Sequence, residues 1–82
     1  MAAADHRVTL VTRVNCHLCE TAEKAAVRLS AELGFAITMV DVDSERALAN
    51  EYSDRVPVIL IDGVEHGYWQ LEEDRFRAAL DR

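Results

Sequence analysis

The chain has only two cysteines, Cys16 and Cys19, and they stand close together in the segment CHLC. A thiolate is both a nucleophile toward disulfides and a ligand for soft metal ions. Side chains at positions i and i+3 lie about one turn apart on the same face of a helix. The sulfurs of Cys16 and Cys19 can therefore meet without movement of the backbone. The pair is therefore a candidate for reversible disulfide chemistry or for part of a metal site.

The elements that flank the cysteines favour disulfide chemistry. Arg7–Thr12 has an alternating, β-branched pattern that predicts a strand. A helix ending at Gly34 is predicted to follow, because apolar residues recur at helical spacing: Leu18, Ala22, Ala25, Leu29 and Leu33. Cys16 then stands at the start of this helix, where free backbone N–H groups and the helix dipole stabilise an anion. We expect Cys16, the more exposed thiol, to attack a disulfide and Cys19 to resolve the mixed disulfide.

Charged side chains near the thiols act in opposite directions. Arg13 and, when protonated, His17 favour the thiolate form of Cys16, whereas Glu20 and Glu23 oppose it. Residue types alone do not decide which influence is larger. We interpret His17 as a solvent-facing modulator of the thiol rather than a proton shuttle.

The single proline, Pro57, begins an apolar run. Proline disfavours a central strand because it donates no backbone hydrogen bond. A cis Val56–Pro57 peptide bond removes this conflict, since a cis proline marks a tight bend. That geometry leaves the Val56 backbone free to pair with an extended segment of a substrate.

The middle of the chain predicts a second strand and a short helix. Phe35–Val42 is apolar at both odd and even positions, so we expect a strand covered on both faces, with Met39 in the core. The segment DVDSERALANEY predicts a short helix with Asp43 or Ser44 as its N-cap.

The last third of the chain predicts a hairpin and a helix. Asp62–Gly63 is a strong signal for a two-residue turn between strands, and Leu71–Leu80 predicts a helix with Phe76 and Leu80 as a core pair. The order β-α-β-α-β-β-α then predicts an α/β fold, a mixed four-stranded sheet with helices on its faces. We expect one domain over residues 1–82, with a flexible tail at residues 1–6.

Composition excludes several classes of function. The chain has 82 residues, a net charge of −6 and no stripe of basic residues, so nucleic acid is not an expected partner. No apolar run is long enough to span a membrane, and the N-terminus does not resemble a signal peptide. We expect a cytoplasmic monomer. In a reducing compartment, a close cysteine pair is more often catalytic or metal-binding than a structural cross-link.

Three segments resemble the small glutaredoxin-like redoxins of the thioredoxin-fold superfamily: TRVNCHLCE after the first strand, VPV opening the third, and IDG at the hairpin turn. The resemblance runs from about Arg7 to Leu80. It implies that Cys16 is the nucleophile and Cys19 the resolving thiol. Pro57 would be a cis-proline facing them, and Val56 the residue whose backbone docks a substrate. Arg13 occupies a position where glutaredoxins often have lysine.

The resemblance implies a thiol–disulfide oxidoreductase that acts on disulfides of proteins or small thiols. The Cys16–Cys19 disulfide would be the only redox group, and glutathione, another low-molecular-weight thiol or a reductase would be the electron donor. Two departures stand out. The chain has His17 and Leu18 where glutaredoxins usually have Pro-Tyr. It also has only Gly67 where they carry two glycines and an acidic pair that holds the glutathione amine.

Other interpretations remain open at this point. The cysteines could instead bind zinc or a bridged iron–sulfur cluster in a non-catalytic binding module, or the module could dock a partner. Arg13 and Arg55 are either solvated charges or groups that hold a carboxylate or thiolate. Tyr68 and Trp69 could line a groove, but we expect them to pack on the core beside the final helix.

Overall fold

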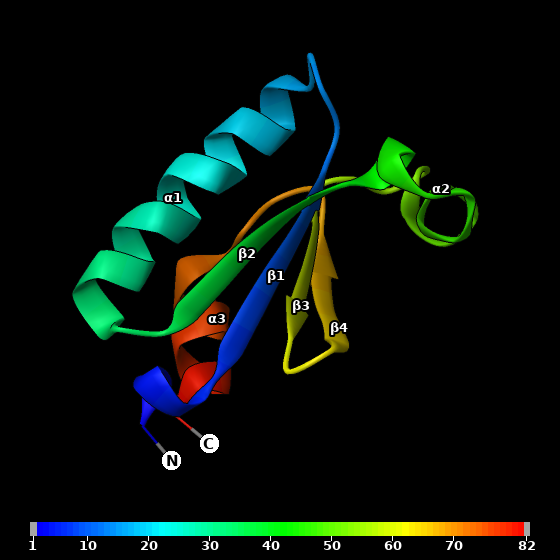
Figure 1. Ribbon diagram of the computed structural model, residues 1–82. Helices are drawn as coiled ribbons and strands as arrows, with labels where there is room; N and C mark the ends of the chain where they lie inside the picture. The colour runs from blue at the N-terminus through cyan, green and yellow to red at the C-terminus, as the bar shows by residue number, and fades with distance from the viewer. Residues whose placement is uncertain (1, 82) are drawn as a thin grey trace.

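The computed structural model describes residues 2–81. Its elements follow the predicted order (Figure 1). The strands are β1 (Arg7–Thr12), β2 (Ala36–Asp41), β3 (Val58–Ile61) and β4 (Val64–Tyr68), and the α-helices are α1 (His17–Leu33), α2 (Arg46–Tyr52) and α3 (Glu73–Leu80). Two 3-10 turns, η1 (Ala3–Asp5) and η2 (Val42–Ser44), precede β1 and α2. Within the described residues, no helix is long and apolar enough to cross a membrane.

The four strands form one mixed sheet in the order β2-β1-β3-β4. β1 pairs with β2 in parallel and with β3 in antiparallel orientation, and β3 and β4 form an antiparallel hairpin. The predicted fold class is therefore confirmed. The hairpin turn also has the predicted residues: Asp62 and Gly63 both have positive φ, 53° and 83°, as a type I′ turn requires.

Helices α1 and α3 cover the same face of the sheet. The main core combines strand residues Val8, Leu10, Ile59 and Ile61 with Ala22, Ala26 and Leu29 of α1 and Phe76 and Leu80 of α3. Phe35 contacts Phe76 edge to face, with ring centroids 5.5 Å apart. Phe76 and Leu80 are fully buried, as predicted. Each side chain of this size contributes roughly 1.5–3 kcal/mol when it leaves water.

Helix α1 has the predicted ends but a different buried face. Cys16 is its N-cap, and Gly34 closes it in a left-handed conformation with φ 86°. The buried residues are Cys19, Ala22, Ala26 and Leu29. The predicted apolar stripe is therefore wrong at Leu18, which is 52% exposed, and Ala25 is only half-buried. Because Cys19 and Ala26 are small, the helix axis can lie close to the sheet, and Leu18 is left facing outward.

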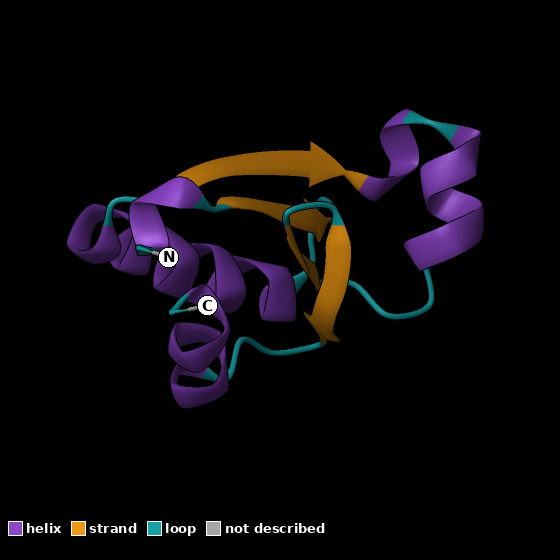
Figure 2. Cartoon of the chain, turned by 90° about the horizontal axis from the view of Figure 1, so that it is seen from below, coloured by secondary structure: helices purple, strands orange, loops and turns teal. Residues whose placement is uncertain are grey.

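The prediction that β2 is covered on both faces is wrong. β2 is an edge strand, and four of its six residues are exposed. Met39, expected in the core, is 40% exposed. The physical reason is the position of α2, which stands apart from the other two helices beyond the end of β2 (Figure 2). Its Tyr52 packs on a small second core of Val11, Val42 and Val58, so α2 does not cover the length of β2.

The short helix begins later than predicted. The segment expected to form one helix divides into η2 and α2, and Glu45 rather than Asp43 or Ser44 precedes α2. Asp41 causes the division, because its carboxylate accepts a hydrogen bond from the N–H of Asp43 and its carbonyl accepts one from the hydroxyl of Ser44. Helix α3 similarly begins at Glu73, two residues after the predicted start at Leu71.

The residues before β1 differ from the flexible tail expected at residues 1–6. Ala3–Asp5 forms η1, and His6 is only 7% exposed. Nδ1 of His6 lies 2.6 Å from Oδ2 of Asp62, and the backbone N–H of Arg7 donates to Oδ1 of the same carboxylate at 2.8 Å. The carboxylate in the hairpin turn thus holds this segment in place. Met1 lies outside the described residues.

Candidate functional site

Cys16 and Cys19 are joined in a disulfide, with their Cα atoms 5.2 Å apart. Cys16 is partly exposed, whereas Cys19 is completely buried on the face of α1 that packs on the sheet. The predicted order of exposure is therefore confirmed. An incoming molecule can reach the sulfur of Cys16, and the sulfur of Cys19 is accessible only to Cys16.

The backbone between β1 and α1 places Cys16 at the helix N-terminus. After β1 the chain turns at residues 14–15, and Asn15 adopts a left-handed conformation with φ 61°. Asparagine tolerates this conformation better than most residues. Cys16 follows with extended backbone, and its Sγ accepts a hydrogen bond from the N–H of Cys19 at 3.2 Å. In the reduced protein the same N–H group and the positive end of the helix dipole favour a thiolate at Cys16.

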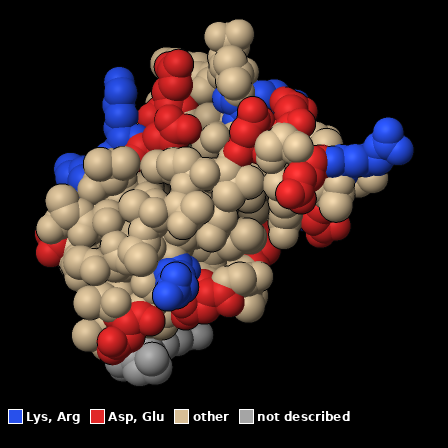
Figure 3. Space-filling model, viewed as in Figure 1, with Lys and Arg blue, Asp and Glu red and all other residues tan. Residues whose placement is uncertain are grey.

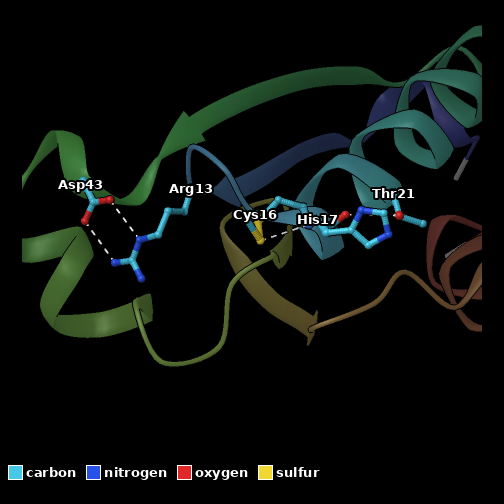
Figure 4. Close-up of a disulfide and its surroundings, with 6 residues drawn as sticks. Arg13, Cys16, His17, Thr21 and Asp43 are labelled. Carbon is cyan, nitrogen blue, oxygen red and sulfur yellow. Dashed lines mark hydrogen bonds and ion pairs between the residues drawn. A yellow bond between two sulfur atoms is a disulfide. The ribbon is translucent and has the colours of Figure 1, made fainter.

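The side chain of Arg13 does not point toward the sulfur of Cys16, although the sequence suggested that it would stabilise a thiolate there. Its guanidinium turns away from Cys16 toward Asp43 (Figure 4), donating from Nε and Nη2 to the two carboxylate oxygens at 3.0 and 3.1 Å. This hydrogen-bonded pair raises the pKa of Arg13 and lowers the pKa of Asp43. Arg13 therefore pairs with a carboxylate of its own chain, and its role beside a substrate stays a prediction.

His17 is exposed, as predicted, and its ring points along α1 away from the disulfide (Figure 4). The backbone carbonyl of His17 accepts a hydrogen bond from the hydroxyl of Thr21, four residues later in α1, at 3.3 Å. The structure therefore gives His17 a position beside the sulfurs but no contact with them.

Val56 and Pro57 lie at the end of the sheet that carries the disulfide. Val11 of β1 pairs with Val58 of β3 in antiparallel register, so the two residues before Val58 adjoin the segment that leaves β1 toward Cys16. The Val56–Pro57 peptide bond is cis, and Pro57 is buried. The carbonyl of Pro57 accepts a hydrogen bond from the N–H of Trp69, whereas no hydrogen bond within residues 2–81 engages the backbone N–H or C=O of Val56.

An aromatic wall beside the disulfide was not expected from the sequence. Tyr68 and Trp69, predicted to pack on the core, are 48% and 54% exposed. Their rings contact each other edge to face, with centroids 5.0 Å apart. Together with Leu18, which stands between the two cysteines, they line a hollow of about 560 Å³. The prediction was wrong because the chain after β4 crosses to α3 along the surface, and no residue pattern signals that path.

Polar groups close the other side of this hollow. The guanidinium of Arg75 donates to the backbone carbonyl of His66 at 2.6 Å, and Glu72 also lines the hollow. Burial lowers the pKa of His66; the charge of Arg75 acts in the same direction, and Glu72 opposes it. Within residues 2–81, no three His, Cys, Asp or Glu side chains are grouped so that they could hold a metal ion together.

Residues 7–81 match the family described as Glutaredoxin-like domain (DUF836). The chain belongs to this family. An uncharacterized protein of Mycobacterium tuberculosis is 41% identical over 81 residues, which cover 93% of this glutaredoxin-like chain and 84% of that protein.

Solved structures agree with this assignment. The solution structure of a protein from Nitrosomonas europaea has a TM-score of 0.79 and 26% identity, covering 90% of this glutaredoxin-like chain and 89% of its own. A mutant thioredoxin from Halobacterium salinarum has a TM-score of 0.67 and 25% identity, covering 98% of this chain and 75% of its own. The glutaredoxin-like chain therefore has the thioredoxin fold, with a cysteine pair at disulfide distance.

Proposed function

We propose that this glutaredoxin-like domain is a dithiol–disulfide oxidoreductase, with Cys16 as nucleophile and Cys19 as resolving thiol. The observation that carries the proposal is the difference between the two bonded sulfurs. One is partly exposed at a helix N-terminus and accepts a backbone hydrogen bond, and the other is completely buried. This asymmetry suits a first step with an external disulfide and a second step within the protein.

The reaction is a pair of thiol–disulfide exchanges. In the first, the thiolate of reduced Cys16 attacks one sulfur of the substrate disulfide, which forms a mixed disulfide and releases the other substrate sulfur as a thiolate. In the second, Cys19 loses its proton and attacks Sγ of Cys16, which releases the second substrate thiolate and forms the Cys16–Cys19 disulfide. Two electrons pass to the substrate, and the protein is left oxidised.

The electron donor must return two electrons to this disulfide. Glutathione, another low-molecular-weight thiol or a reductase could supply them by the reverse exchange, and the Cys16–Cys19 disulfide is the only redox group that the proposal requires. We place the reaction in the cytoplasm, where small thiols keep such disulfides reduced.

The surroundings of the disulfide support a substrate with a peptide backbone. Within residues 2–81 the backbone N–H and C=O of Val56 have no hydrogen-bond partner, and they lie at the same end of the sheet as the disulfide, so an extended segment can pair with them. Leu18, Tyr68 and Trp69 add exposed apolar surface beside it. We therefore propose disulfides of proteins or peptides as the main substrates, with mixed disulfides of small thiols as a second group.

The two cysteine variants test the roles separately. We expect Cys16→Ser to abolish the acceleration that the wild-type protein gives to the reduction of insulin disulfides by dithiothreitol. Cys19→Ser should instead accumulate a covalent mixed disulfide, because the attack that resolves it is lost. Mass spectrometry of the unreduced product distinguishes the two. Full activity of Cys16→Ser would overturn the proposal.

A redox titration of the purified protein, read out by alkylation and mass, tests whether the cysteines form a working couple. We expect one two-electron transition in which both thiols oxidise together. Freshly purified protein should also be assayed for zinc and iron. Bound metal that is lost in both cysteine variants, together with thiols that never pair, would favour a binding module instead.

A further inference from the structure

Arg55 has an unusually complete set of partners for a residue near the surface. Nε and Nη2 donate to the two carboxylate oxygens of Glu65 at 3.0 and 2.9 Å, in a bidentate arrangement. Nη1 donates to the backbone carbonyl of Glu51 at 2.6 Å and to the carboxylate of Asp54 at 3.0 Å, and Nη2 also reaches the carboxylate of Glu51 at 3.5 Å. All five N–H groups of the guanidinium are thus engaged.

These partners belong to different parts of the fold. Glu51 lies in the last turn of α2, Asp54 lies in the segment that follows it, and Glu65 lies in β4. The guanidinium also lies over the ring of Tyr52, 5.3 Å from its centroid. Arg55 therefore links the end of α2 and the segment after it to strand β4 of the hairpin. Val56 is the next residue in the chain.

A second anchor holds the other side of Val56. The carbonyl of Pro57 accepts a hydrogen bond from the N–H of Trp69, just after β4, at 2.8 Å. Val56 is consequently the residue between two attachments to the same hairpin. Within residues 2–81 the N–H and C=O of Val56 have no hydrogen-bond partner, so both can bind an external partner.

We propose that Arg55 is a positioning residue that, through Glu65, holds the Val56 backbone where a peptide substrate can pair with it. This inference rests on the proposed function, since Arg55 itself touches neither the disulfide nor the substrate. Arginine is suited to the task because its planar fork matches a carboxylate, which a lysine ammonium cannot reproduce. A pair of this exposure adds little to global stability, so its main effect is on the local position of the chain.

The test compares two substrates in the same variants. Arg55→Lys and Glu65→Gln should raise KM for insulin disulfides roughly 10-fold, because misplacement of a docking backbone weakens substrate positioning. Hydroxyethyl disulfide has no peptide backbone, so its kinetics should stay unchanged. The midpoint potential of the Cys16–Cys19 pair should stay unchanged as well.

Arg77 provides a matched control. It donates from Nη2 to the carboxylate of Glu32 at 2.7 Å, joining α3 to α1 away from Val56. Arg77→Lys should leave KM for both substrates unchanged. A wild-type KM in Arg55→Lys and Glu65→Gln would overturn the inference, and so would equal losses for the two substrates. If the wild-type protein reduces neither substrate, the proposed function itself fails, which is a distinct result.

Discussion

Trp69 is the residue whose conformation is least expected from its type. Its φ of 70° lies in the left-handed region, which bulky side chains rarely adopt. Such a conformation costs on the order of 1–3 kcal/mol and persists only where neighbouring contacts hold it. Here the hydrogen bond to Pro57 and the edge-to-face contact with Tyr68 do so. In this conformation the indole of Trp69 is 54% exposed and lines the same hollow as Leu18.

Two substitutions separate the backbone of Trp69 from its side chain. Trp69→Ala and Trp69→Gly should both raise KM for a protein disulfide roughly fivefold, equivalent to about 1 kcal/mol of lost apolar contact. Trp69→Gly should be the more stable of the two by about 1 kcal/mol, because glycine adopts positive φ without steric cost. Urea unfolding followed by circular dichroism measures the difference. Equal stability would show that the backbone relaxes, and an unchanged KM would remove the aromatic wall from substrate docking.

Between elements, a single carboxylate connects the N-terminal segment to the β3–β4 turn. Asp62 accepts hydrogen bonds from the N–H of Arg7 and from the ring of His6, and it also occupies the first position of the turn. The backbone hydrogen bond from Arg7 lowers the pKa of Asp62, and the hydrogen bond with His6 lowers it further. Folding and ionisation of Asp62 are therefore linked.

The sign of this linkage gives a prediction for acid. Because the pKa of Asp62 in the folded protein lies below its ordinary value of 3.8, the stabilisation is fully present above that value and is lost as pH falls through the folded pKa. Asp62→Asn should lower the free energy of unfolding at about pH 7, and the deficit should shrink toward about pH 2. Urea titrations across this range measure it, with Asp81→Asn as an exposed control. A deficit independent of pH would exclude the ionised carboxylate as its source.

For the whole molecule, charge is distributed unevenly around the disulfide. Residues 41–55 hold five acidic residues against two arginines, a formal charge of −3 out of a total of −6. Figure 3 shows acidic side chains on the right of the molecule, where Figure 1 places α2, and others at the upper left and the lower edge, while an area without Lys, Arg, Asp or Glu covers the middle of the same face. A reactant that approaches Cys16 therefore meets a negative field on the α2 side.

This field predicts a preference among small disulfides. Cystamine, which is cationic, should react with the reduced protein several-fold faster than an anionic aromatic disulfide of similar reactivity at low ionic strength. The ratio should approach one as salt shortens the Debye length to about 8 Å and below. Stopped-flow rates at several salt concentrations measure it, with neutral hydroxyethyl disulfide as the reference. A faster reaction of the anionic compound at low salt would contradict the prediction.

Features that depend on neighbouring residues could be predicted before the fold was known. The strand before Cys16, the helix that Gly34 ends and the turn at Asp62–Gly63 follow from backbone preferences and side-chain periodicity over a few positions. The cysteine pair is predictable for the same reason, since its spacing within one helical turn brings the sulfurs together.

Contacts between side chains far apart in the sequence, in contrast, depend on how the whole chain folds. Arg13 pairs with Asp43, 30 residues away, and Arg55 pairs with Glu65 across the segment that carries Val56. The fold also leaves Leu18 and Trp69 exposed, although their apolar character predicted burial. Exposure depends on which element covers a position, and α2 and the segment after β4 take paths set by packing of the whole chain. Local residue patterns do not predict those paths, so the residues that surround the disulfide are known only from the folded structure.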